Sequence, residues 1–256
     1  MKKRILLTGS NGMVGRNILN HKMSKKWDFL CPSRTNLNLE NFQEVEDFIG
    51  ANKPDLIIHA AGHVGGIQTN INNPINFLVS NFDIGRNVVM AAKKFGVRKL
   101  INLGSSCMYP RNAPNPLKEE MILQGELEPT NEGYALAKIA VAKLCEYINN
   151  EDSNLQYKTI VPCNIYGPYD KFDEAKSHLI PAIISKLEYA VKNNIDEVEI
   201  WGNGRARREF MYAGDLAEAI IHAVDEFDSM PLIMNIGVGK DYSINDYYLT
   251  IAKIMN

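Results

Sequence analysis

The feature that most constrains the fold is a short apolar run near the amino end that leads directly into three regularly spaced glycines. Residues Arg4–Thr8 form an expected β-strand, and a helical pattern begins after the glycines. Glycines with this spacing permit a tight turn and let backbone N–H groups and a helix N-terminus approach a pyrophosphate. The sequence therefore predicts a dinucleotide-binding loop made of Gly9, Ser10, Asn11, Gly12, Met13, Val14 and Gly15.

Further apolar runs alternate with longer amphipathic segments up to residue 168. The expected strands are Arg4–Thr8, Phe29–Cys31, Asp55–Ala60, Lys99–Gly104 and Tyr157–Pro162. Continuous rather than alternating apolar strands suit a parallel sheet covered on both faces. We therefore expect an α/β fold with a Rossmann-type, doubly wound parallel sheet. Two long helices, Pro74–Phe95 and Tyr134–Asn149, carry more apolar positions than one buried stripe needs, which indicates either a dimer contact or burial under a second lobe.

The pattern changes after Gly167 and Pro168 to shorter pieces interrupted by proline and charged residues. The expected elements are helices near Ser177–Asn193 and Asp215–Asp228 and strands near Glu197–Trp201 and Ile233–Ile236. We predict a Rossmann domain over residues 1–168 and a small substrate-binding lobe over residues 169–256, some segments of which return to the first domain.

Composition excludes several other classes. The 28 Lys and Arg residues against 30 Asp and Glu give a net charge of -2, which offers no field for nucleic acid. The apolar run after Met1–Arg4 is too short for a signal peptide, and no stretch approaches a membrane span, so we expect a cytoplasmic protein. The four cysteines form no CxxC pair or metal-ligand cluster, so no metal site is expected. Cys31, Cys145 and Cys163 fit as small hydrophobic residues.

The segment after the second expected strand indicates which dinucleotide is used. An NAD enzyme carries Asp or Glu about 20 residues past the glycines, whereas this chain has Cys31-Pro32-Ser33-Arg34. An arginine here can pair with a 2′-phosphate. We therefore predict NADP(H) as cofactor, the alternative for Arg34 being a solvated surface charge.

A tyrosine and a lysine four residues apart open the expected helix over Tyr134–Asn149. Tyr134 and Lys138 lie on one helix face, and a nearby ammonium lowers the pKa of a phenol. Ser105 ends the strand Lys99–Gly104, where it can donate a hydrogen bond to the same substrate carbonyl, and Ser106 is the competing serine. These residues predict a proton-transfer site of the short-chain dehydrogenase/reductase type.

Motifs along almost the whole chain match one specific family. They are Gly12–Gly15, Val64–Ile67, Ser105–Pro110, Glu128–Ala135, Asn164–Pro168, Ser177–Ala182, Trp201–Gly204 and Arg208–Phe210. With these segments the chain resembles the GDP-L-fucose synthases of the extended short-chain dehydrogenase/reductase superfamily. The resemblance implies a homodimer that takes a GDP-linked 4-keto-6-deoxy sugar, epimerises C3 and C5 and reduces C4 with NADPH.

The same resemblance assigns further roles. It makes Cys107 the base and His178 the acid of epimerisation, and it places Lys186, Trp201 and Arg208 on the GDP-sugar. Its remaining cofactor contacts are Ala60, Ala61, Leu103, Gly104, Lys138, Pro162, Asn164, Ile165 and His178. If strand geometry persists beyond Ser105, Cys107 projects to the same side as that serine. The alternatives are packing for Cys107 and Trp201 and a helix cap for His178.

Departures from the family pattern leave other functions open. Gly133 and His63 stand where relatives have proline and lysine, Asn11 stands where a second basic cofactor contact can occur, and the chain ends at Asn256 before a substrate-contacting segment. The first rival is a reductase of another GDP-4-keto sugar, a deoxy-sugar or a heptose, with or without epimerisation. A second is a UDP-sugar 4-epimerase or dehydratase. A rival of another class is a binding protein that retains NADP(H) without turnover.

Overall fold

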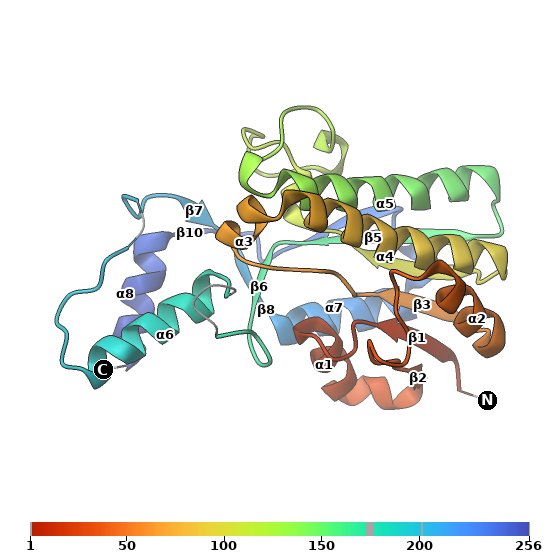
Figure 1. Ribbon diagram of the computed structural model, residues 1–256, viewed down its shortest axis with the longest axis horizontal. Coiled ribbons are helices and arrows are strands. Elements are labelled where there is room, and N and C mark those ends of the chain that lie inside the picture. Colours follow the sequence, from red (N-terminus) through yellow and green to blue (C-terminus); the bar gives the residue numbers. More distant parts are fainter. Residues whose placement is uncertain (1, 173–176, 201, 256) are drawn as a thin grey trace.

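A six-stranded parallel sheet forms the centre of the protein in the computed structural model, which describes residues 2–172, 177–200 and 202–255 (Figure 1). The strands run in the order β2-β1-β3-β4-β5-β9, and each neighbouring pair is parallel. Their bounds are β1 Arg4–Thr8, β2 Asp28–Leu30, β3 Leu56–His59, β4 Lys99–Leu103, β5 Gln156–Pro162 and β9 Ile233–Ile236. The expected doubly wound sheet is confirmed.

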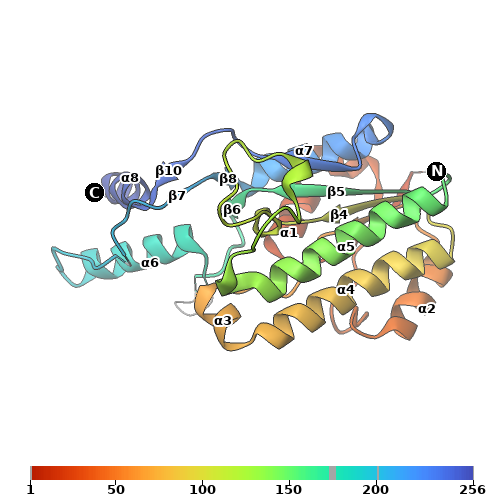
Figure 2. The same cartoon turned by 90° about the horizontal axis from the view of Figure 1, so that it is seen from above.

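Helices cover both faces of this sheet because successive strand side chains point to opposite sides. Ile5 and Leu7 pack in a core with α1 (Met13–Asn20) and α7 (Ala213–Asp225), whereas Leu6 packs in a second core. Three helices cover that second face: α2 (Phe42–Asn52), α4 (Pro74–Lys94) and α5 (Glu132–Glu151). Figure 2 shows α4 and α5 side by side along their length.

Elements from the second half of the chain build a smaller lobe beside the carboxyl ends of the strands (Figures 1 and 2). Its helices α6 (Leu179–Lys192) and α8 (Ile244–Met255) pack on each other. Two small sheets connect it to the body: β6 (Asn164–Tyr166) with β8 (Phe210–Tyr212), and β7 (Arg207–Arg208) with β10 (Tyr242–Ser243).

Short helical pieces complete the chain. They are α3 Ile67–Asn72 and the 3₁₀ turns η1 Lys22–Lys26, η2 Ser106–Met108, η3 Glu119–Met121, η4 Pro129–Asn131 and η5 Phe227–Ser229. No helix in the described ranges combines the length and apolar character needed to cross a membrane.

The part of the chain after residue 168 differs from its expected strands in one place. The predicted strand near Glu197–Trp201 is wrong for residues 197–200, which are irregular, while Trp201 lies outside the described residues. Glu197 and Glu199 are exposed, and the Glu199 carbonyl accepts a hydrogen bond from Lys186 Nζ instead of a strand partner. The other segments return to the main body, since β9 pairs with β5 and α7 packs on α1.

One cysteine expected to be a small core residue lies elsewhere. Cys145 is buried and Cys163 is half-buried, but Cys31 is exposed. The reason is that β2 ends at Leu30, one residue earlier than predicted, so Cys31 lies beyond the sheet. There partial burial raises the pKa of its thiol, and the nearby Ser10 of the glycine loop opposes this increase.

Candidate active site

The glycine loop connects β1 to α1 in a turn that side chains would obstruct. Gly9 has a φ of +70°, and a Cβ on it would lie 2.7 Å from the Ala61 nitrogen. A Cβ on Gly15 would lie 2.4 Å from the Gly9 oxygen. Gly12 is the N-cap residue of α1. Because glycine has no side chain to cap the helix, the first N–H groups of α1 are left for another partner. This cradle fits a pyrophosphate, and Ser10, Asn11, Met13 and Val14 belong to it.

Lys138 and Tyr134 lie together in the first turns of α5, below the end of β4. Lys138 is 8% exposed, and its Nζ donates a 2.8 Å hydrogen bond to the Leu103 carbonyl. The same Nζ lies 5.7 Å from the centre of the Tyr134 ring. The predicted i, i+4 pair therefore shares one helix face and is anchored to the carboxyl end of the sheet.

Ser105 and Cys107 follow β4 in a 3₁₀ turn and not in a strand. The strand ends at Leu103, and Ser105 caps η2 by accepting a hydrogen bond from the Cys107 N–H at 3.5 Å. The premise that strand geometry continues to Cys107 is wrong, because the chain must turn away after Gly104. The turn nevertheless keeps Cys107 beside Ser105, whose hydroxyl lowers the pKa of both the Cys107 thiol and the Tyr134 phenol against the larger effect of burial.

Burial controls the acidity of this cluster. It raises the pKa of Tyr134 above its ordinary value, with a smaller increase from Cys107, while the Ser105 hydrogen bond opposes it. Burial also raises the pKa of Cys107 to about 11, opposed by Ser105 and Lys138, and lowers the pKa of Lys138 to about 8. The expected lowering of the Tyr134 pKa is therefore not observed. Both raised pKa values favour the protonated tyrosine and cysteine at neutral pH, so Tyr134 carries a proton that it can donate.

His178 stands apart from this cluster in the described parts of the chain. It occupies the N-cap position of α6, but its exposed side chain makes no cap hydrogen bond there. Near it, burial raises the pKa of the Asp170 carboxyl, and the Lys171 N–H and His178 oppose this increase. No hydrogen bond between described residues joins His178 to Ser105, Cys107 or Tyr134.

The predicted substrate contacts lie in the smaller lobe. Lys186 on α6 donates to the Glu199 carbonyl, and exposed Arg208 on β7 donates to the Arg207 carbonyl at 2.7 Å. No described hydrogen bond or ion pair joins these two cations. Trp201 falls outside the described residues.

Most of the remaining predicted cofactor contacts lie at the carboxyl ends of the strands. Ala60 and Ala61 follow β3, Gly104 follows β4, and Pro162 ends β5. Asn164 and Ile165 lie in β6, the next strand along the chain. Arg34 lies beyond β2, where its side chain is 84% exposed and pairs with Glu40 at 3.4 Å.

Two polar networks beside the site were not predicted. Asn81 on α4 accepts a hydrogen bond from the His63 N–H at 2.8 Å and donates to the His63 carbonyl at 3.0 Å. Tyr109, just after η2, donates to Asn235 on β9 at 2.6 Å. The members of these pairs are 18 and 126 residues apart in sequence, and the local signal for the second pair is an asparagine within the apolar strand β9.

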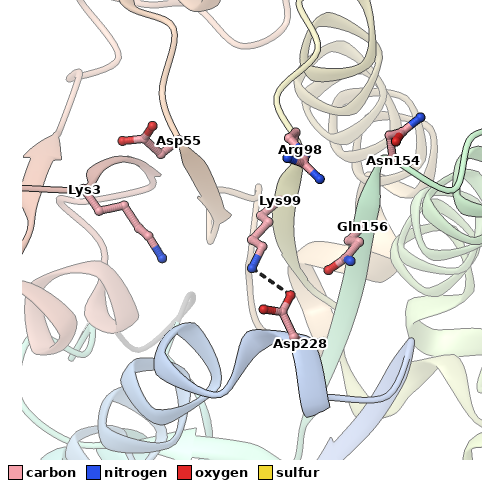
Figure 3. Close-up of a pocket in the computed structure, with 7 residues that line it drawn as sticks. All are labelled: Lys3, Asp55, Arg98, Lys99, Asn154, Gln156 and Asp228. Atoms are coloured by element: carbon pink, nitrogen blue, oxygen red, sulfur yellow. Dashed lines mark hydrogen bonds and ion pairs between the residues drawn. The ribbon is translucent and has the colours of Figure 1, made fainter.

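A pocket at the opposite edge of the sheet contains none of these residues. Lys3, Asp55, Arg98, Lys99, Asn154, Gln156 and Asp228 line it (Figure 3). They lie at the amino ends of β1, β3, β4 and β5, or in η5, and the Lys99–Asp228 ion pair spans 2.7 Å. This pocket is therefore separate from the carboxyl-end cluster, where open α/β sheets bind ligands.

Known proteins resemble this chain over nearly its full length. A GDP-L-colitose synthase from Yersinia pseudotuberculosis is 58% identical over 98% of this chain and 82% of its own length. A GDP-L-fucose synthase from Azorhizobium caulinodans is 48% identical, with 99% and 81% covered. The structure of a GDP-mannoheptose C4 reductase from Campylobacter jejuni with NADP bound is 30% identical and has a TM-score of 0.88. The match covers 99% of this chain and 85% of the reductase chain.

These relatives confirm the predicted resemblance to GDP-L-fucose synthases and the expected enzyme class. The NADP-bound relative agrees with the predicted cofactor, and the close backbone contacts at Gly9 and Gly15 show why the loop requires glycine there. The sequence profile of the NAD dependent epimerase/dehydratase family matches residues 5–237. The chain therefore belongs to the NAD dependent epimerase/dehydratase family, as a GDP-L-fucose synthase-like enzyme.

Proposed function

We propose that this enzyme reduces the C4 carbonyl of a GDP-linked 4-keto-6-deoxy sugar with NADPH and inverts carbon centres beside that carbonyl. The observation that carries the proposal is the cluster of half-buried Ser105, Cys107 and Tyr134 with buried Lys138 at the carboxyl end of β4. It combines a carbonyl-polarising hydroxyl pair with a thiol, and simple binding of a dinucleotide needs neither.

Each side chain has a distinct task in this chemistry. Ser105 and Tyr134 donate hydrogen bonds to the carbonyl oxygen, which stabilises an enolate during inversion and an alkoxide during reduction. Tyr134 then gives its proton to that oxygen. When bound, NADPH supplies the hydride. Lys138, with its lowered pKa of about 8, keeps a positive charge near Tyr134 at neutral pH.

Inversion needs a second pair of proton-transfer groups because a 4-keto group acidifies the adjacent C–H bonds. Cys107 lies close enough to Ser105 to act at those carbons, and we assign it the role of base. His178, from the loop before α6, is assigned the opposite-face acid. Its exposed position requires the bound sugar to bridge the cluster and the smaller lobe.

The identity of the sugar follows from the relatives. The 58% identical GDP-L-colitose synthase favours a 3,6-dideoxy substrate, since colitose has no C3 hydroxyl and needs inversion at C5 alone. The fucose synthases favour a substrate with that hydroxyl. The GDP-heptose reductase supports a third candidate, reduction without inversion. In each case we place GDP against Lys186, Trp201 and Arg208.

Assembly and location complete the proposal. Helices α4 and α5 present exposed apolar side chains on their outer surface, including Ile75, Leu78, Val79 and Leu136. We propose that this surface joins two copies into a homodimer, which size-exclusion chromatography with light scattering will measure. We also propose a cytoplasmic location and a division into a cofactor domain, 1–168, and a substrate lobe, 169–256.

The direct test compares nucleotide sugars. NADPH oxidation is followed with GDP-4-keto-6-deoxy-mannose, with its 3-deoxy analogue, and with a UDP-4-keto-6-deoxy sugar. We expect turnover of one or both GDP substrates and little with the UDP substrate. Turnover of the UDP substrate alone, or no net NADPH oxidation with any of them, would contradict the proposal.

The choice of NADPH over NADH is tested at Arg34. Arg34→Ser removes the proposed partner of the 2′-phosphate and should lower the NADPH-over-NADH preference by about tenfold, the value of one modest charge-assisted hydrogen bond. Glu40→Gln, which removes the 3.4 Å ion-pair partner of Arg34 but leaves the arginine, is the matched control. An unchanged preference in Arg34→Ser assigns the arginine to the solvated surface.

A further inference from the structure

A row of buried polar side chains crosses the central sheet close to the carboxyl ends of its strands. Thr8, His59, Asn102 and Thr159 are paired in register across β1, β3, β4 and β5. Their exposed fractions are 1%, 2%, 1% and 1%. They point to the face covered by α4 and α5, because the strand residues two positions earlier pack in that core. Polar groups buried this deeply require partners.

Thr8 and His59 satisfy each other together with one backbone group. The Ala61 N–H donates to Thr8 Oγ1 at 3.3 Å, and Thr8 Oγ1 lies 2.8 Å from His59 Nδ1. These are the two hydrogen-bond partners of the Thr8 hydroxyl among the described residues. Because the Thr8 hydroxyl has no other acceptor among the described residues, we assign its proton to Nδ1 as the unprotonated acceptor and the imidazole proton to Nε2.

This short chain of hydrogen bonds joins two segments of the proposed cofactor site. Thr8 immediately precedes the glycine turn, and Ala61 is the second residue after the end of β3. The two segments touch, since a Cβ on Gly9 would lie 2.7 Å from the Ala61 nitrogen and 2.8 Å from the Ala60 carbonyl carbon. The next residue, Gly62, approaches Lys138, whose Nζ is 3.7 Å from a Cβ built there.

The surroundings of His59 oppose a positive charge. Burial, and then the charge of Lys138 on α5, lower the pKa of His59 to about 3. In the part of the chain that the structure describes, Lys138 is the charged group acting on this imidazole. The neighbouring Thr8 and Asn102 side chains on the adjacent strands are uncharged. Protonation would remove the Nδ1 acceptor and place a second cation near the catalytic lysine.

We propose that His59 is a positioning residue: as a neutral acceptor for Thr8, it holds the glycine turn and the Ala60–Ala61 segment in the arrangement that receives the dinucleotide. The inference rests on the proposed use of NADPH, but the hydrogen bond and the neutral state of His59 belong to the protein alone. Two measurements therefore test it, one with the cofactor and one without.

The first measurement is NADPH affinity by calorimetry, with folding checked by circular dichroism. Thr8→Val keeps the shape of the side chain but leaves both the Ala61 N–H and His59 Nδ1 without a partner, so we expect about tenfold weaker binding or more. Thr8→Ser keeps the hydroxyl and should bind within about threefold of wild type. His59→Asn offers an oxygen near the Nδ1 position and should also retain most of the affinity, whereas His59→Leu should not.

The second measurement is the unfolding free energy of the ligand-free protein against pH. The native pKa of His59, about 3, lies below its ordinary value of 6.5. The unfolded chain then binds a proton that the native protein does not, so this contribution is complete above pH 6.5 and is lost as the pH falls toward 3. His59→Asn should flatten that loss relative to wild type, even if its stability is lower at every pH.

The outcomes separate this inference from the proposed function. If wild type binds NADPH and Thr8→Val binds it equally well, the positioning role is overturned and the proposed function stands. If His59→Asn shows the same pH dependence of stability as wild type, the neutral state assigned to His59 is overturned. A wild-type protein that binds no NADPH overturns the proposed function, and the role in positioning the dinucleotide fails with it, whatever the pH dependence.

Discussion

The cofactor-facing half of the molecule and the substrate-facing lobe hold their functional side chains in different ways. Lys138 is 8% exposed, and its Nζ is hydrogen bonded to the Leu103 carbonyl at the end of β4. In the lobe, Arg208 is exposed and α8 contributes no fully buried residue. In the proposed function, the sheet thus fixes the groups that carry out the chemistry, whereas the nucleotide sugar would contact a less well packed lobe. Substitutions in the two regions should differ accordingly.

The largest effect is expected in the buried half, at the proton donor. Tyr134→Phe should leave NADPH binding nearly intact and lower the rate of reduction by about 10² to 10⁴, because the hydroxyl acts mainly in the transition state. Single-turnover oxidation of NADPH measures this rate. A variant with near-normal turnover would remove Tyr134 from the mechanism.

The next effect separates two reactions inside the same cluster. Cys107→Ala should abolish deuterium incorporation from solvent beside the keto group while reduction survives, since Ser105, Tyr134 and Lys138 remain in place. His178→Asn should retain some exchange but give little inverted product. Wild-type exchange and inversion in both variants would make Cys107 and His178 structural and the enzyme a simple 4-keto reductase.

The two reactions should also respond to pH in opposite directions. Deprotonated Cys107 becomes more abundant as the pH rises toward its pKa of about 11, so exchange should increase from neutral pH upward. Lys138 loses its charge above its pKa of about 8, so reduction should decline there. Rates of exchange and of NADPH oxidation between pH 6.5 and 9.5 measure both trends. Parallel profiles would show that one shared group limits both steps.

A smaller effect is expected in the lobe. Arg208→Ala should raise KM for the GDP-sugar by about 10- to 100-fold with little change in kcat, the signature of lost ground-state binding to a diphosphate. Arg207→Ala, which removes the neighbouring arginine paired with Asp241 at 2.8 Å, is the control and should affect KM less. A fall in kcat without a change in KM would instead bring Arg208 into the chemical step.

The smallest expected effects concern stability and compare the regions directly. A Cβ on Gly85 would lie 2.4 Å from Val141 across the α4–α5 contact, so Gly85→Ala should destabilise the protein by about 1–3 kcal/mol. Leu249 on α8 is 70% exposed, and Leu249→Ser should change the unfolding free energy by no more than about 0.5 kcal/mol. Chemical denaturation gives both values, and a reversed order would contradict the contrast between a tightly packed body and a thin lobe.

The same contrast explains how much the sequence could predict. The elements of the central sheet were predicted to within a residue or two, because buried parallel strands are continuously apolar and the first one leads into glycines. The strand expected at Glu197–Trp201 was wrong over its described residues. There the Glu199 carbonyl accepts a hydrogen bond from Lys186 Nζ and not from a neighbouring strand.

Features of the candidate site likewise differ in how well the sequence predicts them. Tyr134 and Lys138 could be paired from helical spacing alone, and Ser105 from its place at a strand end. The turn at Cys107 and the raised pKa of Tyr134 could not be predicted, because both depend on burial by segments distant in sequence. His59 and Thr8 lie 51 residues apart, and only the register of β1 and β3 brings them together.

In the proposed mechanism one cluster at the carboxyl end of β4 performs both inversion and reduction on a GDP-linked 4-keto sugar. This claim is tested most directly by NMR and mass spectrometry of the product formed from GDP-4-keto-6-deoxy-mannose, or its 3-deoxy analogue, with NADPH in deuterated water. We predict a C4-reduced product with deuterium at the inverted centre, C5 alone for the 3-deoxy sugar. A reduced product with neither inversion nor deuterium beside C4 would contradict the claim.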